Sequence, residues 1–210
     1  MTGRRSAVLT LCVVLSALAP GAQADHDGAS CPPAPDHSAA LDGLFAQLKS
    51  APNALAAMKI TNRMWGFWAD APDAYAQQLL DEGMTRRTAY DFAGAVDAFH
   101  ALVSHCPDYA EGYNQRAFVN FIRQDYTAAL PDLQRAVALS PRHLGALSGL
   151  ALTLVALQRT DEAARVLRRA VELNPWLRER HLSPKIGGPE DGGDAPPPAG
   201  AAEGPKTQDI

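Results

Sequence analysis

The sequence has too few residues of several kinds to support the more specialised classes of protein. Only 3 of its 210 residues are cysteine and only 7% are aromatic, so a small fold held together by many disulfides is excluded. Neither sign of charge dominates, because 19 lysines and arginines stand against 23 aspartates and glutamates. With a net charge of -4 the chain has no excess of basic residues for phosphates, and we expect no nucleic-acid partner.

Motifs for catalysis are also absent. The sequence contains no nucleophile elbow, no phosphate-binding glycine loop, no His-Glu-x-x-His zinc helix and no Cys-x-x-Cys pair. His26 and His37 flank Cys31, but no fixed spacing makes these side chains a ligand set. We therefore predict a protein that is not an enzyme and that has no cofactor and no metal site. The sequence supports an enzyme or metal protein that uses Cys31 and these histidines less well than the two binding functions described below.

Only one stretch is continuously apolar, and it lies near the amino terminus. Arg4 and Arg5 precede the apolar residues 7–19, and Ala22-Gln23-Ala24 has the small-x-small spacing of a cleavage site. This order is typical of a secretory signal peptide, and the run is short for a membrane span of about 20 residues. We predict a signal peptide over 1–24, with a retained anchor as the alternative, and no membrane span in the mature chain.

The predicted signal peptide places the protein outside the cytoplasm. The content of alanine, arginine and glycine suggests a bacterial source, so the expected location is the periplasm, with secretion second. Cleavage leaves two cysteines, Cys31 and Cys106. In an oxidising compartment these either form a disulfide or remain two independent thiols, and the sequence leaves both alternatives open.

Helix-forming patterns fill the middle of the chain. Alanine occurs 39 times, which favours helices that pack closely, and no segment of the second half alternates like a strand. After a polar arm over 25–39, apolar residues recur at helical spacing up to residue 50, and a second such segment carries Trp65 and Trp68. We predict an all-α fold, a helical hairpin over 40–71, and both tryptophans in its core.

The most informative feature is a repeat of 34 residues. Pro107, Pro141 and Pro175 are spaced by this length and divide the chain into gapless units over 76–109, 110–143 and 144–177. Proline ends a helix because it has no N–H to donate and its ring clashes with the preceding turn. The eighth and twentieth residues of each unit are small, so that two helices can cross closely; they are Gly83, Ala117 and Ala151, and Ala95, Ala129 and Ala163.

The helices expected from this pattern lie roughly over 74–88, 92–105, 110–123, 127–139, 144–157 and 161–173. Asp91 and Asp125 stand where the first helix of a unit meets the second, and each can accept a hydrogen bond from the amino end of the second helix. Two features depart from ideal packing. Pro131 should bend the second helix of the middle unit, and the seventh and eleventh residues of the first two units are polar side chains that need partners if they are buried, Glu82, Arg86, Arg116 and Asn120.

The repeat resembles the tetratricopeptide repeat (TPR) family over residues 76–177. The resemblance implies a short α-solenoid over 72–177, in which three helix-turn-helix units follow the hairpin and curve around a concave groove. It also implies that the first helix of each unit lines this groove. The side chains carried over to this sequence are Leu80, Met84, Asn114, Phe118, Phe121, Ser148, Leu152 and Val155.

These residues predict a protein- or peptide-binding scaffold of the cell envelope whose partner is unknown. The positions at which some family members hold a terminal carboxylate carry other residue types here, so an acidic C-terminal peptide is not the expected ligand. The alternative is a structural adaptor that uses the Trp hairpin or the convex face, with the groove filled by the chain itself.

The carboxyl-terminal side carries two further predictions. Few apolar residues follow the helix over 161–173, so we expect its outer face to be incompletely covered and to support a homo-oligomer. Residues 178–210 are rich in glycine and proline and are expected to form a disordered tail.

Overall fold

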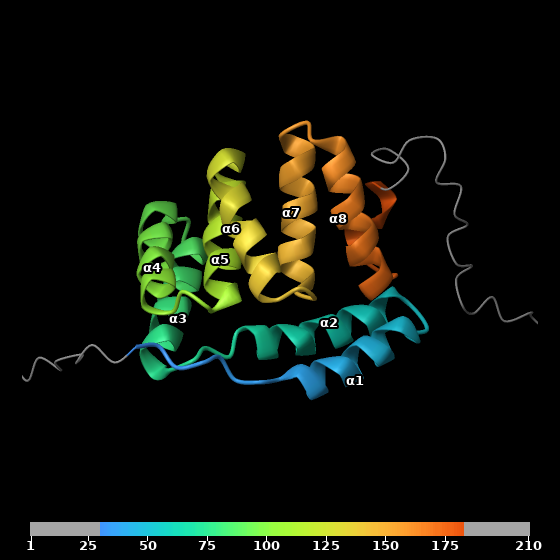
Figure 1. Ribbon diagram of the computed structural model, residues 1–210, viewed down its shortest axis with the longest axis horizontal. Helices are drawn as coiled ribbons and strands as arrows, with labels where there is room; N and C mark the ends of the chain where they lie inside the picture. Colours follow the sequence, from blue (N-terminus) through green and yellow to red (C-terminus); the bar gives the residue numbers. More distant parts are fainter. Residues whose placement is uncertain (1–29, 183–210) are drawn as a thin grey trace, which may run out of the picture.

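The computed structural model describes residues 30–182, and this part of the chain contains helices and no strand. The predicted signal peptide and most of the predicted tail lie outside the described residues. Figure 1 shows the helices of the repeats upright, above the helices of the hairpin, which run across their lower ends. The elements are α1 (Ser38–Lys49), α2 (Ala54–Trp68), α3 (Ala74–Thr88), α4 (Phe92–His105), α5 (Ala110–Ile122), α6 (Tyr126–Leu139), α7 (Leu144–Ala156), α8 (Thr160–Leu173) and the 3-10 helix η1 (Arg178–Leu182).

The three predicted units are the pairs α3–α4, α5–α6 and α7–α8. All six helices begin and end within one residue of the predicted bounds. The side chains of Asp91 and Asp125 accept the backbone N–H of Gly94 and Ala128 at 3.0 and 3.1 Å, as predicted for N-terminal caps. The turn inside each unit contains one residue with a left-handed backbone at the same repeat position, Tyr90, Gln124 or Gln158.

Small residues allow the paired helices to approach each other as expected. Gly83 of α3 faces the buried ring of Phe99, and a Cβ atom at this position would lie only 2.4 Å from that ring. The equivalent alanines, Ala117 and Ala151, are themselves buried. The first unit therefore tolerates less side-chain volume at this crossing than the other two, because its partner is a phenylalanine rather than a leucine.

Three of the four polar side chains at the seventh and eleventh positions, those of Glu82, Arg86 and Arg116, have partners. Arg86 forms ion pairs with Glu82 and Asp91, at 2.8 and 2.9 Å. Arg116 donates two hydrogen bonds to the buried carboxylate of Asp132, at 2.7 and 2.6 Å. These bidentate contacts satisfy the guanidinium between α5 and α6.

The hairpin α1–α2 does not stack in front of the first unit. Figure 1 shows it running across the lower ends of the repeats. Its apolar residues form one core cluster with Leu144 of α7, against which Leu173 and Trp176 also pack. Arg142 and Asp42, which are 100 residues apart in sequence, form an ion pair at 2.5 Å. The hairpin therefore joins the amino-terminal part of the chain to the third unit.

The described part of the arm, residues 30–37, is extended and tied down at two points. A disulfide joins Cys31 to Cys106, with Cα atoms 5.1 Å apart, so the structure selects the first of the two alternatives for these cysteines. His37 lies 2.7 Å from a carboxylate oxygen of Asp70. The predicted arm over 25–39 is therefore attached to the folded part of the chain through its described residues.

The carboxyl-terminal end is better covered than predicted. Leu177 is buried and Leu182 of η1 packs on the same core cluster, so the predicted tail begins with ordered residues. The exposed residues along α8 are mainly charged, including Asp161, Arg165 and Glu172. Self-association through α8 stays a prediction, without an exposed large apolar side chain on this helix to support it. No helix within residues 30–182 has the length and apolar character needed to cross a bilayer.

Candidate functional site

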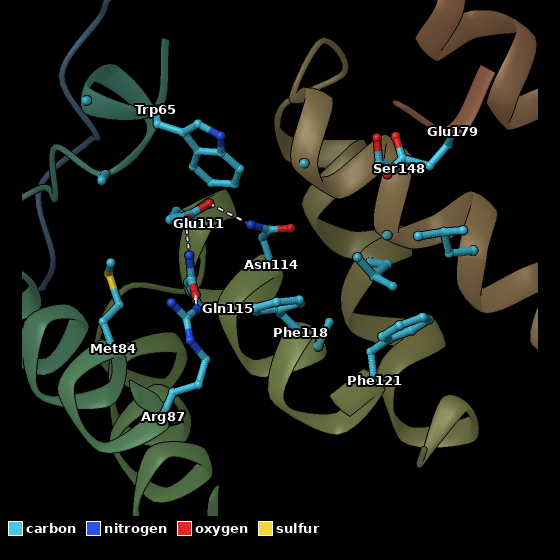
Figure 2. A pocket seen from close by; sticks show the side chains of 17 residues that line it. Trp65, Met84, Arg87, Glu111, Asn114, Gln115, Phe118, Phe121, Ser148 and Glu179 are labelled. Atoms are coloured by element: carbon cyan, nitrogen blue, oxygen red, sulfur yellow. Dashed lines mark hydrogen bonds between the residues drawn. The ribbon is translucent and has the colours of Figure 1, made fainter. Parts of the chain in front are cut away.

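The concave side of the repeats contains a cavity with a volume of about 560 Å³. Figure 2 shows side chains from the first helix of each unit converging on it, with Trp65 at its rim. Six of the eight side chains predicted for the groove line this cavity, namely Met84, Asn114, Phe118, Phe121, Ser148 and Leu152. The structure thus brings together predicted groove residues from all three units.

Two predicted groove residues are not part of the cavity lining. Leu80 is completely buried in the core between α3 and α4, together with Ala71 from the segment that connects the hairpin to α3. Val155 is half-buried and packs with Leu133 and Leu154 against the core between the second and third units. Leu80 therefore does not line the groove, and Val155 does not line this cavity.

One wall of the cavity is apolar and accessible, and we call Phe118, Phe121 and Leu152 the open wall. Phe118 is 47% exposed, although it belongs to the middle of the solenoid. The ring of Phe121 rests edge-on against Tyr126 with centroids 5.3 Å apart, which fixes its orientation. An exposed phenylalanine beside two further apolar side chains is typical of an interaction surface.

The opposite end of the cavity is closed by the hairpin, and we call Trp65, Trp68 and His143 the hairpin seat. The buried Trp68 ring stacks on the imidazole of His143 at a centroid distance of 4.3 Å. Trp65 meets the same imidazole edge-on at 5.5 Å and lines the cavity. Gly145 permits this approach, since a Cβ atom there would lie 2.5 Å from the Trp65 ring. Of the two tryptophans predicted to be core, only Trp68 is fully enclosed.

A hydrogen bond from Tyr109 strengthens this closure. Its hydroxyl donates to the backbone carbonyl of Trp68 at 2.9 Å. Burial raises the pKa of the Tyr109 hydroxyl far above its ordinary value, so the group keeps its proton and continues to donate. The chain therefore fills its own groove at the hairpin seat, while the open wall remains accessible.

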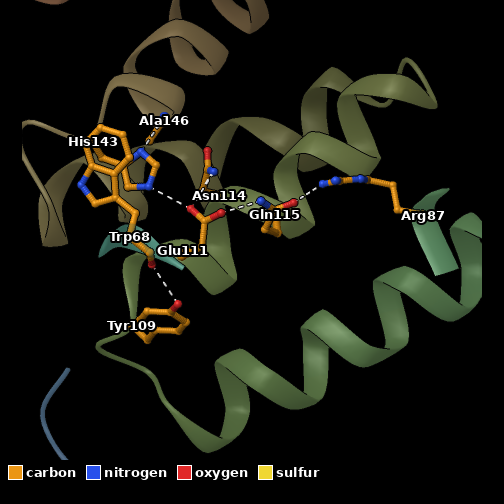
Figure 3. A network of polar contacts seen from close by, with 8 residues as sticks. All are labelled: Trp68, Arg87, Tyr109, Glu111, Asn114, Gln115, His143 and Ala146. Carbon is orange, nitrogen blue, oxygen red and sulfur yellow. Dashed lines mark hydrogen bonds and ion pairs between the residues drawn. The ribbon is translucent and has the colours of Figure 1, made fainter. Parts of the chain in front are cut away.

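A buried carboxylate lies between these two regions (Figure 3). Glu111 is 1% exposed and accepts hydrogen bonds from Asn114 at 2.9 Å and Gln115 at 2.5 Å. His143 Nε2 lies 2.8 Å from the same carboxylate. The backbone N–H of Ala146 donates to His143 Nδ1 at 3.2 Å, so Nδ1 carries a lone pair and Nε2 carries the proton. Three side-chain donors thus surround one buried carboxyl group.

Arg87 continues this network to the cavity surface. It donates to the side-chain oxygen of Gln115 and places its guanidinium 5.0 Å from the centre of the Phe118 ring. Desolvation lowers the pKa of the Arg87 guanidinium, and the charge of Glu111 opposes this shift. An arginine nevertheless keeps its charge in proteins. Within residues 30–182 no ion pair with a carboxylate is formed by Arg87, so its cation faces the cavity beside the open wall.

Comparison with known proteins identifies the repeats. The model of the tetratricopeptide repeat family matches residues 121–175. A TPR repeat-containing protein of Rhizobium etli is 33% identical over 114 residues, which cover 54% of this chain and 56% of that protein. Tetratricopeptide repeat protein 36 of Mus musculus is 31% identical over 123 residues, covering 56% of this chain and 65% of its own. The chain thus spans less than two thirds of the length of these relatives.

A solved structure shows the same arrangement of helices. The first TPR of Spaghetti (RPAP3), bound to the HSP90 peptide SRMEEVD, superposes with a TM-score of 0.51 at 26% identity. The match covers 53% of this chain and 89% of that one. The fold is therefore that of scaffolds for protein–protein interaction.

Proposed function

This chain is a tetratricopeptide-repeat protein, and from that premise we propose that it is a non-enzymatic scaffold that binds a peptide or protein segment at its open wall. The observation that carries the proposal is the exposed Phe118 ring in a cavity of about 560 Å³. Burying this ring and its apolar neighbours under a partner removes them from water, which supplies affinity at roughly 25 cal/mol for each Å² of apolar surface.

Polar groups around the open wall orient the bound segment. Ser148 lines the cavity with its hydroxyl group, and Asn114 keeps its side-chain oxygen as an acceptor while its amide donates to Glu111. Arg87 adds a positive charge at the edge of the apolar surface. We therefore expect a ligand in which an apolar side chain stands next to a carboxylate, because the first fills the cavity and the second meets the guanidinium.

Peptide selection on the purified chain tests this proposal. Peptides chosen from a random displayed library are labelled, and their affinity is measured by fluorescence anisotropy for the wild type and for Phe118→Ser. Loss of a central aromatic anchor is expected to weaken binding roughly tenfold or more. Leu55→Ser is the matched control, because Leu55 is also an exposed apolar residue, on α2, and lies outside the cavity.

The affinity of the control decides between binding sites. We expect Leu55→Ser to bind like the wild type and Phe118→Ser to bind weakly with unchanged helix content by circular dichroism. Equal binding by wild type and Phe118→Ser rejects the open wall as the site. Arg87→Gln is the second variant, and it is expected to weaken acidic peptides more than their amide analogues.

A second candidate function rests on the hairpin. Leu55 and Met58 lie one turn apart on α2 and are 58% and 52% exposed, which gives the hairpin an apolar surface of its own. In this structural adaptor the partner contacts α2, and the open wall takes no part. Binding that is lost in Leu55→Ser and kept in Phe118→Ser favours the adaptor.

We also propose that the protein works in the cell envelope, with the periplasm before secretion. The disulfide between Cys31 and Cys106 suits an oxidising compartment. Expression of the full chain in a bacterial host, followed by mass measurement of the protein from the periplasmic fraction, tests this. A mature chain that begins at Asp25 is expected, whereas an uncleaved cytoplasmic chain contradicts the proposal.

A further inference from the structure

The disulfide lies in a cluster of potential metal ligands that is separate from the groove. Cys31, Cys106, His105 and Asp73 each direct one ligand atom into this cluster, and all four atoms lie within 4.8 Å of one another. In the oxidised chain the two sulfur atoms are bonded to each other and cannot serve as thiolate ligands. We propose that the reduced chain binds one Zn²⁺ ion at these four residues.

Three of the four ligands are already held in place by the fold. One oxygen of Asp73 accepts the N–H of Ala76 at 2.7 Å as the cap of α3, and the other lies 2.8 Å from Nε2 of His105. The His105 ring is also held edge-on by Tyr75, at a centroid distance of 5.0 Å. Cys106 ends α4, where its N–H donates to Leu102, and it is buried.

The fourth ligand can adjust its position. Cys31 belongs to the extended arm, not to a helix, so its sulfur can move when the disulfide is opened. Two thiolates bound tetrahedrally to zinc at about 2.3 Å stand about 3.8 Å apart, which is a small displacement from their bonded positions. A site of two thiolates, one imidazole and one carboxylate matches the sulfur, nitrogen and oxygen ligands of tetrahedral zinc better than those of Ca²⁺ or Mg²⁺.

The environment also suits a closed structural site. Cys106 belongs to the main core cluster of the first unit, and Cys31 packs against it, so apolar groups surround one side of the ligands. Four protein ligands leave no position for a water molecule, as in structural zinc sites. The arm would thus stay attached to α3 and α4 in both redox states, through a disulfide in one and a metal ion in the other.

Reduction of the disulfide and binding of Zn²⁺ convert the oxidised chain into the metal-bound chain. A dithiol reductant gives two electrons and two protons to the bond between Cys31 and Cys106 and leaves as its own disulfide. This produces two thiols. Zn²⁺ then displaces both thiol protons to the buffer and binds the neutral imidazole of His105 together with the carboxylate of Asp73.

Cobalt titration of the reduced chain tests the site. The full chain carrying Cys12→Ser, which removes the one cysteine outside the cluster, is reduced with a phosphine and titrated anaerobically with Co²⁺. We expect a thiolate-to-cobalt charge-transfer band that saturates at one equivalent and disappears when Zn²⁺ is added. The same chain in its oxidised form is expected to give no band.

Two variants and one matched control keep the result specific. His105→Asn removes the nitrogen ligand, and Asp73→Asn removes the anionic ligand while asparagine still caps α3. Each substitution is expected to lower the affinity for the metal ion roughly tenfold or more. His37→Asn is the control, because His37 forms a similar pair with Asp70 and is not part of the cluster. Unchanged affinity in both ligand variants, or equal binding by the oxidised chain, overturns the proposal.

Discussion

The two ends of the groove use similar residue types for opposite purposes. At the hairpin seat, aromatic rings from α2 cover His143, and the Trp68 and His143 side chains are almost completely removed from solvent. At the open wall, the aromatic ring of Phe118 lies beside the Arg87 guanidinium and remains 47% exposed. The same concave surface therefore contributes folding free energy at one end and is free for a partner at the other.

The comparison shows that an extra element can shorten a repeat groove without filling it. The hairpin closes the end at which Glu111 and His143 need shielding from water, because a buried carboxylate is stable only when every donor around it stays in place. The open wall contains no such buried charge, and so nothing in it requires cover. We expect substitutions at the first end to change stability and those at the second to change binding.

The largest expected effect is at the buried carboxylate. Glu111→Ala leaves the donors of His143, Asn114 and Gln115 without an acceptor and should reduce the free energy of unfolding by about 3–5 kcal/mol. Urea unfolding followed by circular dichroism measures this. Glu82→Ala is the control, since Glu82 forms an ion pair at the surface and should cost no more than about 1 kcal/mol. Equal losses in both variants would contradict the role given to the buried Glu111 network in stability.

Loss of the disulfide should have the next largest effect. The bond joins residues that are 75 positions apart, and replacing Cys31 and Cys106 by alanine should reduce the free energy of unfolding by about 2–4 kcal/mol. Since the bond holds the arm that precedes α1, hydrogen exchange should rise more in the hairpin than in α5 and α7. A uniform rise over all helices contradicts this localisation.

Substitution at the open wall should change stability least among the apolar sites. Phe118→Ser should alter the free energy of unfolding by less than about 1 kcal/mol, because nearly half of this side chain is already exposed. Trp68→Ser at the hairpin seat is the comparison, and as a fully enclosed ring it should cost about 3–5 kcal/mol. Thermal unfolding of both variants checks the contrast, which fails if Phe118→Ser is as harmful as Trp68→Ser.

The smallest expected change in the free energy of unfolding is the one that acid causes at Asp73, which follows the hairpin. The N–H of Ala76 and, after it, His105 lower the pKa of the Asp73 carboxyl below its ordinary value. Its contribution to stability is therefore complete above the unfolded pKa of about 3.9 and is lost as the pH falls through the lower folded value. Asp73→Asn, which caps α3 without titrating, should make stability less dependent on pH below 4. An unchanged pH profile contradicts this role.

The sequence predicts the repeats well because their determinants are local. Small residues at Gly83 and Ala95, a capping aspartate at Asp91 and a terminating proline at Pro107 act within one unit, and the helix bounds follow from them. These determinants also place most of the groove residues, since a helix face is fixed by its period. Leu80 is the exception, because it is completely buried in the core of the first unit.

The contacts between distant segments were beyond prediction. Glu111 and His143 meet because α5 and α7 are neighbours, and Trp68 reaches them from a hairpin whose docking no periodicity specifies. The same holds for Cys31 and Cys106, which the sequence leaves as either a disulfide or two thiols. Asp73 joins His105 and the cysteines only after the arm is placed. Such sites depend on packing between elements, which hydrophobic patterns within single elements do not describe.

The most direct test of the central claim is crosslinking from the two exposed apolar surfaces. A photoreactive phenylalanine analogue is introduced at position 118 or at position 55 of the full chain, and crosslinks to a selected peptide are mapped by mass spectrometry. The account predicts crosslinked peptide from position 118, abolished by excess unlabelled peptide, and none from position 55. Crosslinking from position 55 alone would contradict the claim that the open wall is the binding site.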